Sequence, residues 1–164
     1  MEKDKELSHI NEEGQAQMVD VGEKPSSERW ARTRAEVRLS AEGLAKVQQA
    51  EEKASSFRTV VETAGMMAAK RTSELIPHCH PLPLTHIDVS MTIDEEASKL
   101  IVDATVKTRG QTGVEMEAMT AVSVAALTIY DMVKAVDPAA RIESTRLIEK
   151  HGGSSGDIVL EDES

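Results

Sequence analysis

The chain has 164 residues, a length typical of one domain, which at this size buries roughly 70% of the surface that the unfolded chain exposes. Its net charge of -10 and pI near 5.0 argue against a general nucleic-acid binder, because that affinity comes from many Lys and Arg side chains. An anionic small molecule could still bind where basic residues cluster. Only 2% of the residues are aromatic, so the core is expected to consist of Ala, Val, Ile, Leu and Met.

Neither secretion nor membrane insertion is indicated. Cys79 is the only cysteine, so no intrachain disulfide can form, and the first residues lack the apolar segment of a secretory signal. The longest apolar run, residues 112–136, carries charged residues at both ends, unlike a membrane span. We therefore expect a cytoplasmic protein without a membrane or nucleic-acid partner.

The N-terminal part of the chain divides into an arm and a strand. Residues 1–24 are polar and are expected to form a flexible arm, before a single domain over residues 25–150. Within residues 29–39, apolar and charged residues alternate as in a half-buried strand. The arginines of this strand are expected to face solvent, with an anion-binding edge as the alternative.

Two helices follow. Ser40 is a suitable N-cap for a helix that continues to about residue 52, and Ser55 or Ser56 begins a second helix that Pro77 ends. Gly65 lies inside the second helix, where glycine costs ~1 kcal/mol relative to alanine. Its presence there suggests that another backbone packs closely against the helix.

A hairpin comes next. Residues 85–94 alternate strictly between apolar and polar side chains, and residues 100–108 do the same after a short turn. Two such runs predict a pair of antiparallel strands.

Residues 112–136 form the longest predicted helix, whose middle is so apolar that it must be buried in a core or against another copy of the chain. At its start, Thr112 and Glu115 have the spacing of a capping box. Near its end, Asp131 and Lys134 are three residues apart, which by itself is typical of an exposed ion pair.

Residues 141–148 form the last predicted strand, and residues 151–164 are expected to be a flexible tail. The element order is then strand, helix, helix, strand, strand, helix, strand. Strands with one polar face predict an α+β fold in which an antiparallel sheet carries helices on one face, of ferredoxin-like character.

Two segments carry candidate chemistry. Prolines stiffen the segment that holds His78, Cys79 and His80, which could form a polar ligand site, a tight surface connection or a metal site. Metal ligands are usually spaced more widely than these three residues. The glycine-rich residues 152–156 could cradle a phosphate through their N–H groups, although they lack the lysine and spacing of a P-loop.

Five motifs, in this order and spacing, resemble the MoaC family of cyclic pyranopterin monophosphate synthases, which act in molybdenum cofactor biosynthesis. The motifs are MVDV (18–21), AAKRT (68–72), LIPHCHPLPL (75–84), TGVEMEAMTAVSVAALTIYDMVKA (112–135) and GGSSGD (152–157). The resemblance spans nearly the whole chain.

The resemblance implies a lyase that converts (8S)-3',8-cyclo-7,8-dihydroguanosine 5'-triphosphate to cyclic pyranopterin monophosphate with loss of diphosphate. By motif position, Asp131 would be the catalytic acid or base and Lys134 its cationic partner near the phosphates. The implied substrate-binding residues are His78, Cys79, His80, Met116 and Glu117. The family forms hexamers, as trimers of dimers with sites between subunits. No cofactor is implied, although Mg²⁺ could assist the phosphate chemistry.

The chain differs from the family's usual pattern at three positions. An ungapped match places Ala54 where the family has a lysine, with Lys53 one residue earlier, and Ser154 replaces the tail lysine. His78 stands where leucine is common. If Lys53 does not substitute for the missing base, the alternative is a non-catalytic ligand-binding or assembly paralogue. A metal-binding module is the second alternative.

Overall fold

Alternating apolar and polar residues make the strands of a single antiparallel sheet. The computed structural model describes residues 6–162, and the strands are β1 (Ser27–Arg38), β2 (Leu84–Asp94), β3 (Lys99–Gly110), β4 (Arg141–His151) and the short β5 (Ile158–Val159). Their order across the sheet is β2-β3-β1-β4-β5. Every neighbouring pair is antiparallel, and β1 lies at the centre of the sheet between β3 and β4.

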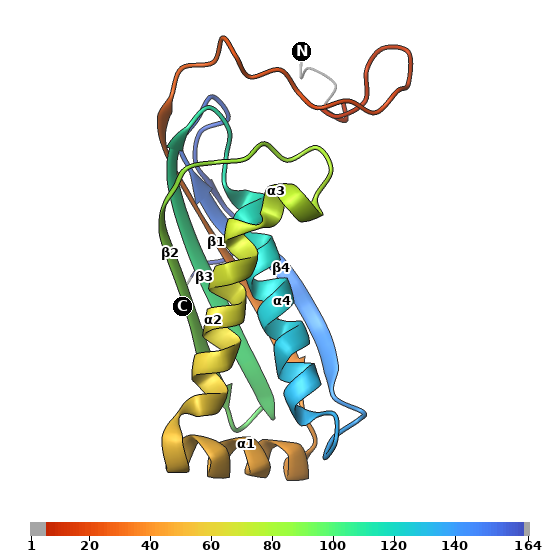
Figure 1. Cartoon of the computed structure of the whole chain (residues 1–164), viewed down its shortest axis with the longest axis vertical. Coiled ribbons are helices and arrows are strands. Elements are labelled where there is room, and N and C mark those ends of the chain that lie inside the picture. The colour runs from red at the N-terminus through yellow and green to blue at the C-terminus, as the bar shows by residue number, and fades with distance from the viewer. Residues whose placement is uncertain (1–5, 163–164) are drawn as a thin grey trace.

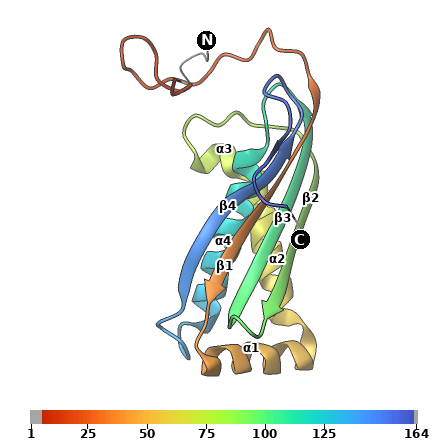
Figure 2. The same ribbon diagram turned by 180° about the vertical axis from the view of Figure 1, so that it is seen from behind.

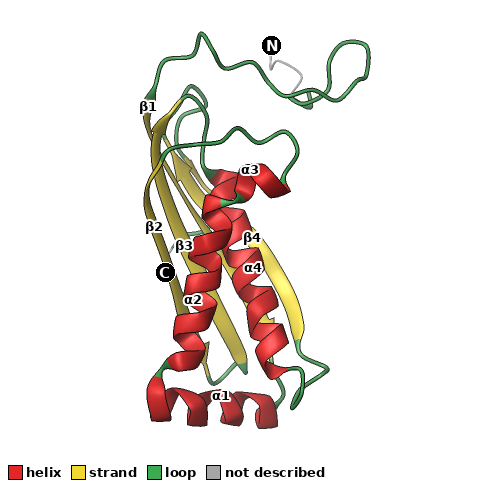
Figure 3. Cartoon of the chain, viewed as in Figure 1, coloured by secondary structure: helices red, strands yellow, loops and turns green. Residues whose placement is uncertain are grey.

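The helices are α1 (Ala41–Ala54), α2 (Ser56–Lys70), the one-turn α3 (Thr72–Leu75) and α4 (Glu115–Val133). Figures 1 and 3 show α2 and α4 side by side on one face of the sheet, with α1 across one end. Seen from behind, the other face of the sheet carries no helix (Figure 2). Two strand–helix–strand units with this strand order make a ferredoxin-like arrangement, so the predicted α+β fold with helices on one face is confirmed.

The core lies between the sheet and the two long helices. One face of β1, from Ala31 to Val37, is fully buried under α4, whose Val122, Ala125 and Ile129 are also fully buried. Among the described residues, α4 is the one helix that is long and apolar enough to cross a membrane. Half of its most apolar stretch is buried in the fold, as is usual for a core helix.

Gly65 packs as its position in α2 suggested. A Cβ atom at Gly65 would lie 3.0 Å from the carbonyl oxygen of Ala121 in α4 and 3.0 Å from Cγ1 of Val89 in β2. The glycine therefore lets α2, α4 and the sheet meet closely, and the prediction of close packing is confirmed.

Both of these helices begin where the sequence predicted, but only the first has the predicted side-chain cap. Ser40 caps α1 by accepting a hydrogen bond from the N–H of Gly43 at 3.0 Å. Ser55 precedes α2, but it makes no side-chain cap because its left-handed backbone already serves as the C-cap of α1.

The predicted capping box of Thr112 and Glu115 is wrong. Val114 is the N-cap of α4 and makes no side-chain cap. The Glu115 carboxylate instead accepts a hydrogen bond from Nζ of Lys150 in β4 at 2.5 Å. A charge-assisted contact with a distant strand has replaced the local bond that the spacing favoured.

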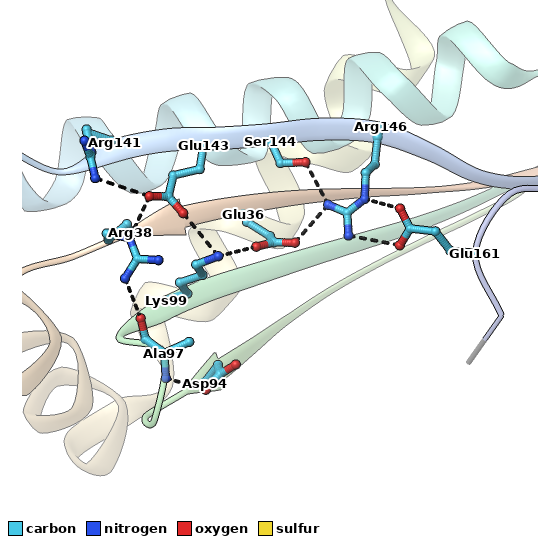
Figure 4. A network of polar contacts seen from close by, with 10 residues as sticks. All are labelled: Glu36, Arg38, Asp94, Ala97, Lys99, Arg141, Glu143, Ser144, Arg146 and Glu161. Atoms are coloured by element: carbon cyan, nitrogen blue, oxygen red, sulfur yellow. Dashed lines mark hydrogen bonds and ion pairs between the residues drawn. The ribbon is translucent and has the colours of Figure 1, made fainter. Parts of the chain in front are cut away.

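On the helix-free face of the sheet, charged side chains form a continuous network (Figure 4). Glu36 accepts from Lys99 at 2.7 Å and from Arg146 at 2.8 Å, and Glu143 accepts from Arg38 at 2.6 Å. The β1 arginines 32, 34 and 38 lie on this open face partly exposed, and each also pairs with a carboxylate of a neighbouring strand.

The two terminal segments lie against the domain. Nε2 of Gln111 donates to the carbonyl oxygens of Gly22 and Lys24 at 3.2 and 3.0 Å, and Arg146 binds both carboxylate oxygens of Glu161. The predicted division into an arm, a domain and a tail stays a prediction, and residues 1–5 and 163–164 lie outside the described part of the chain.

Candidate active site

A pocket of about 390 Å³ opens where α4 begins, at the end of the sheet opposite α1. Four distant parts of the chain line it together with the first turn of α4: the N-terminal arm, the start of β1, the proline-rich segment after α3, and the end of β4 with the glycine-rich loop. All five residues that the resemblance assigns to substrate binding line this pocket: His78, Cys79, His80, Met116 and Glu117.

Glu117 is the buried acid of the pocket. It is 4% exposed, and burial, reinforced by the nearby charge of Glu115, raises its pKa from 4.5 to about 7. A carboxyl group that is half ionised near neutral pH can both accept and return a proton during one reaction cycle. The neighbouring Glu115 carboxylate forms an ion pair with Lys150.

The segment that follows α3 contributes a thiol and two imidazoles to the same pocket. The N–H of Cys79 donates to the carbonyl of Ile76 at 3.1 Å, which closes a tight turn. Burial, with a smaller effect from the charge of Glu117, raises the pKa of the Cys79 thiol, so it stays protonated at neutral pH. The ring of His78 stacks on His9 of the N-terminal arm, with centroids 5.8 Å apart.

Basic and hydroxyl side chains line the rest of the pocket, as an anionic ligand requires. Arg29 of β1, Lys150 of β4 and Lys24 of the arm all reach it, together with Ser154 and Ser155 of the glycine-rich loop. Arg29 is held by the hydrogen bond of its Nε to the carbonyl of Gly110 at 3.0 Å. Of the β1 arginines, Arg29 therefore supports the alternative prediction of an anion-binding edge on this strand.

Several of these residues gave no signal in the sequence. Lys150 and Arg29 occupy strand positions that look like ordinary outward-facing charges, and His9 and Lys24 belong to a polar arm. Strand order brings Arg29 and Lys150 together, because β1 and β4 are neighbours although they are more than one hundred residues apart in sequence. Across β1, Gly110 of β3 pairs with Ser27 and Lys150 of β4 pairs with Ala31.

Asp131 and Lys134 lie outside the pocket of their own chain. Fourteen residues of α4 separate Asp131 from Glu117, a rise of about 21 Å along the helix. The two side chains pair at 2.5 Å and are 70% and 56% exposed, as predicted for an i and i+3 pair. The hydrogen bond to Asp131 raises the pKa of Lys134. Lys53 lies exposed in the last turn of α1, also at the end of the fold away from the pocket.

Metal binding by the histidine and cysteine segment lacks a ligand set. Across residues 6–162, no group of three or more His, Cys, Asp or Glu side chains is arranged to hold a metal ion. The free thiol of Cys79 and the imidazoles of His78 and His80 are polar groups in the lining of the pocket.

Comparison with known proteins gives consistent matches over almost the whole chain. The model of the MoaC family matches residues 18–153. The relatives that match include three proteins named cyclic pyranopterin monophosphate synthase. That of Cereibacter sphaeroides is 53% identical and covers 92% of this chain and 94% of its own. That of Thermomicrobium roseum is 51% identical, covering 96% and 95%, and that of Syntrophomonas wolfei is 51% identical, covering 93% and 98%.

Among solved structures, a de novo designed protein with a ferredoxin fold matches with a TM-score of 0.40 and 13% identity, covering 82% of this chain and 95% of its own. The family match covers the five residues assigned to substrate binding and both long helices, and the relatives share about half of the aligned residues. The chain therefore belongs to the MoaC family, as its motifs predicted.

Proposed function

We propose that this protein is a cyclic pyranopterin monophosphate synthase of molybdenum cofactor biosynthesis. It would act as a lyase that converts (8S)-3',8-cyclo-7,8-dihydroguanosine 5'-triphosphate to cyclic pyranopterin monophosphate and diphosphate. The names of its relatives support this activity. The structural observation that carries the proposal is the pocket that combines the buried acid Glu117 with three basic side chains.

The chemistry fits these residue types. Opening and reclosing a guanine-derived ring moves protons on and off nitrogen and carbon, which suits an acid with a pKa near 7. Forming a cyclic phosphate as diphosphate leaves requires positive charge on the phosphate oxygens. Arg29, Lys150 and Lys24 line the pocket and would supply that charge. Mg²⁺ could share this role, but the roles proposed for these residues do not require it.

The other proposed catalytic residues would come from a second copy of the chain. Asp131 and Lys134 stand exposed at the opposite end of α4, where they can enter a neighbour's pocket. Leu127, 58% exposed, and Met132, 39% exposed, lie on the same stretch of α4 and would be covered by that neighbour. We propose that pairs of chains share their sites in this way and that three pairs form a hexamer.

The replaced lysines of the family pattern have structural substitutes in this proposal. Lys53 lies at the same end of the fold as Asp131, so it would reach the shared site from the same neighbouring chain. Ser154 lines the pocket without a charge, while Lys150 and Lys24 provide cations close to it. We further propose that the enzyme works in the cytoplasm. Its partner would be the small-molecule substrate, with neither nucleic acid nor membrane involved.

The test is an assay with the cyclic triphosphate, in which diphosphate and pyranopterin are both measured. The wild type is expected to release the two products in equal amounts. Glu117→Gln is expected to lower kcat by about 100-fold or more, because the proton carrier is lost. Glu96→Gln, an exposed acid in the β2–β3 turn, is the matched control and should leave kcat unchanged.

Binding without turnover would contradict the proposal. A folded wild type that binds the cyclic triphosphate but releases no diphosphate would be a ligand-binding paralogue, which is the alternative that the replaced lysines raise. Elemental analysis that found one tightly held metal ion per chain would instead support the metal-binding alternative at His78, Cys79 and His80.

A further inference from the structure

The loop of residues 152–157 is closed on itself at the end of β4. Nδ1 of His151 lies 3.1 Å from Oδ2 of Asp157, and Oδ1 of Asp157 accepts a hydrogen bond from the N–H of Gly152 at 3.1 Å. A further bond runs from the N–H of Gly156 to the carbonyl of Gly153 at 3.2 Å. We call the contacts among His151, Gly152 and Asp157 the clasp.

The clasp is anchored to β1 by an aromatic contact. The imidazole of His151 lies flat on the indole of Trp30, with ring centroids 4.0 Å apart and an interplanar angle of 13°. These two residues are paired directly across β1 and β4. The stack therefore fixes the imidazole plane, and with it the direction in which Nδ1 reaches the loop.

The closed loop fits tightly against a pocket residue. Gly152 and Gly153 have φ angles of +91° and +82°, which disfavour any residue with a side chain. A Cβ at Gly153 would collide with the guanidinium of Arg29, and one at Gly152 with the carbonyl of Glu28. The loop backbone thus packs on Arg29, while Ser154 and Ser155 extend into the pocket.

Charged groups around His151 favour its protonated form. Nε2 of the imidazole lies 3.0 Å from the Glu149 carboxylate, on the side away from Asp157. Glu149 also pairs with Arg32 at 3.2 Å, so the cluster holds two carboxylates and two cations when His151 is charged. The contact with Glu149 and then that with Asp157 raise the pKa of His151, while the Gly152 N–H and then His151 lower the pKa of Asp157.

We propose that His151 and Asp157 are positioning residues of the active site, which close the loop of residues 152–157 and so hold Arg29, Ser154 and Ser155 in place for the phosphates of the substrate. Neither residue lines the pocket, and both act through neighbours that do. This inference rests on the proposed function, because it assigns the loop to a phosphate-bearing substrate. The clasp is intact while His151 is protonated and loosens as the pH rises through its pKa.

The clasp can be observed without any substrate, because Trp30 is the only tryptophan of the chain. A stacked imidazolium quenches indole fluorescence, so a fluorescence titration is expected to show a transition above pH 6.5, the ordinary pKa of histidine. The transition should vanish in His151→Gln and move to lower pH in Asp157→Asn. His86→Gln, an exposed histidine in β2, is the matched control and should titrate like the wild type. A transition at the same pH in Asp157→Asn and the wild type would overturn the clasp.

Steady-state kinetics with the cyclic triphosphate tests the positioning role. Asp157→Asn is expected to raise KM about tenfold with kcat within about threefold, as for the loss of one charge-assisted contact that orders a binding loop. Asp88→Asn, an exposed acid in β2, should change neither constant. The wild-type KM should rise with pH along the fluorescence transition. An unchanged KM in Asp157→Asn would overturn the positioning role. A wild type without turnover would overturn the proposed function instead, and the titration would still decide whether the clasp exists.

Discussion

At the scale of single residues, the account depends on one buried carboxyl group. Glu117 lies in the first turn of α4, where the helix N-terminus and solvent would usually favour ionisation. Burial outweighs this effect and raises its pKa to about 7. The cost of ionising Glu117 in the folded protein should therefore be visible in stability as well as in catalysis.

Glu117→Gln is predicted to change stability in a pH-dependent way. Between its ordinary pKa of 4.5 and its folded pKa of about 7, Glu117 binds more protons in the folded than in the unfolded state, so stability falls as the pH rises through this window. Above it, the ionised carboxyl destabilises the fold by up to about 3 kcal/mol. The variant should thus melt at a higher temperature than the wild type near pH 8 and show little of this advantage near pH 5. An equal difference at both pH values would mean that Glu117 titrates normally.

Candidate site residues could be predicted where they lie in sequence motifs. They could not be predicted where only the tertiary structure places them in the pocket. His78, Cys79 and Glu117 stand in segments whose pattern is specific to the family. Lys150 stands in a strand of alternating charges, and its partner Glu115 is 35 residues away. Local spacing favoured a capping box for Glu115. In the structure Glu115 binds the distant Lys150 instead, because a charged donor binds a carboxylate more strongly than a backbone N–H at a helix start does.

At the scale of elements, the pattern of the sequence predicted almost every strand and helix. The alternation of apolar and polar residues predicted β2 and β3, and the long apolar run predicted α4. Each prediction lies within a few residues of the observed ends. The short α3 and β5 were missed because one turn of helix and two residues of strand carry no period. Gly65 inside α2 conflicted with the local helix propensity, and its explanation is a close contact between layers.

Gly65→Ala is predicted to destabilise the protein. Better helix propensity would contribute about 1 kcal/mol of stability, but the new methyl group would press on the backbone oxygen of Ala121, and overpacking of this kind costs about 1 to 3 kcal/mol. We expect a net loss of up to about 2 kcal/mol in urea unfolding. A gain of stability would show that α2 and α4 can separate slightly without cost.

The network on the helix-free face of the sheet should respond to acid. The hydrogen bond from Arg38, and then that from Lys99, lowers the pKa of Glu143 to about 2. Its contribution to stability is present above the unfolded pKa and is lost as the pH falls toward 2. The melting temperature of Glu143→Gln should therefore lie below that of the wild type at neutral pH and converge with it in acid. Glu96→Gln serves as the exposed control, and a constant difference across the pH range would rule out this role.

The arm is predicted to contribute to substrate binding through Lys24. Its side chain lines the pocket, and its carbonyl is held by Gln111 at 3.0 Å. Lys24→Ala should raise KM about threefold to tenfold with little change in kcat, because one cation near the phosphates is lost. Lys107→Ala, an exposed lysine on β3, is the matched control. The assignment of the arm to the site would fail if both variants had the wild-type KM at low ionic strength.

At the scale of the whole molecule, α4 carries its two groups of candidate residues at opposite ends. Glu117 and Glu115 begin the helix in the pocket, and Asp131 with Lys134 ends it in solvent, about 21 Å away. A helix of this length cannot bend to bring the two groups together, since its middle is packed in the core. If both groups act in one reaction, two chains must share each site.

The most direct measurement of this central claim is complementation between two inactive variants. Glu117→Gln and Asp131→Asn are each expected to lack activity with the cyclic triphosphate. After unfolding together and refolding, half of the pairs are mixed, and each mixed pair has one intact site, so activity should return to about a quarter of the wild-type value. No recovery, in a sample whose mixed pairs are confirmed by native mass spectrometry, would contradict the sharing of sites between chains.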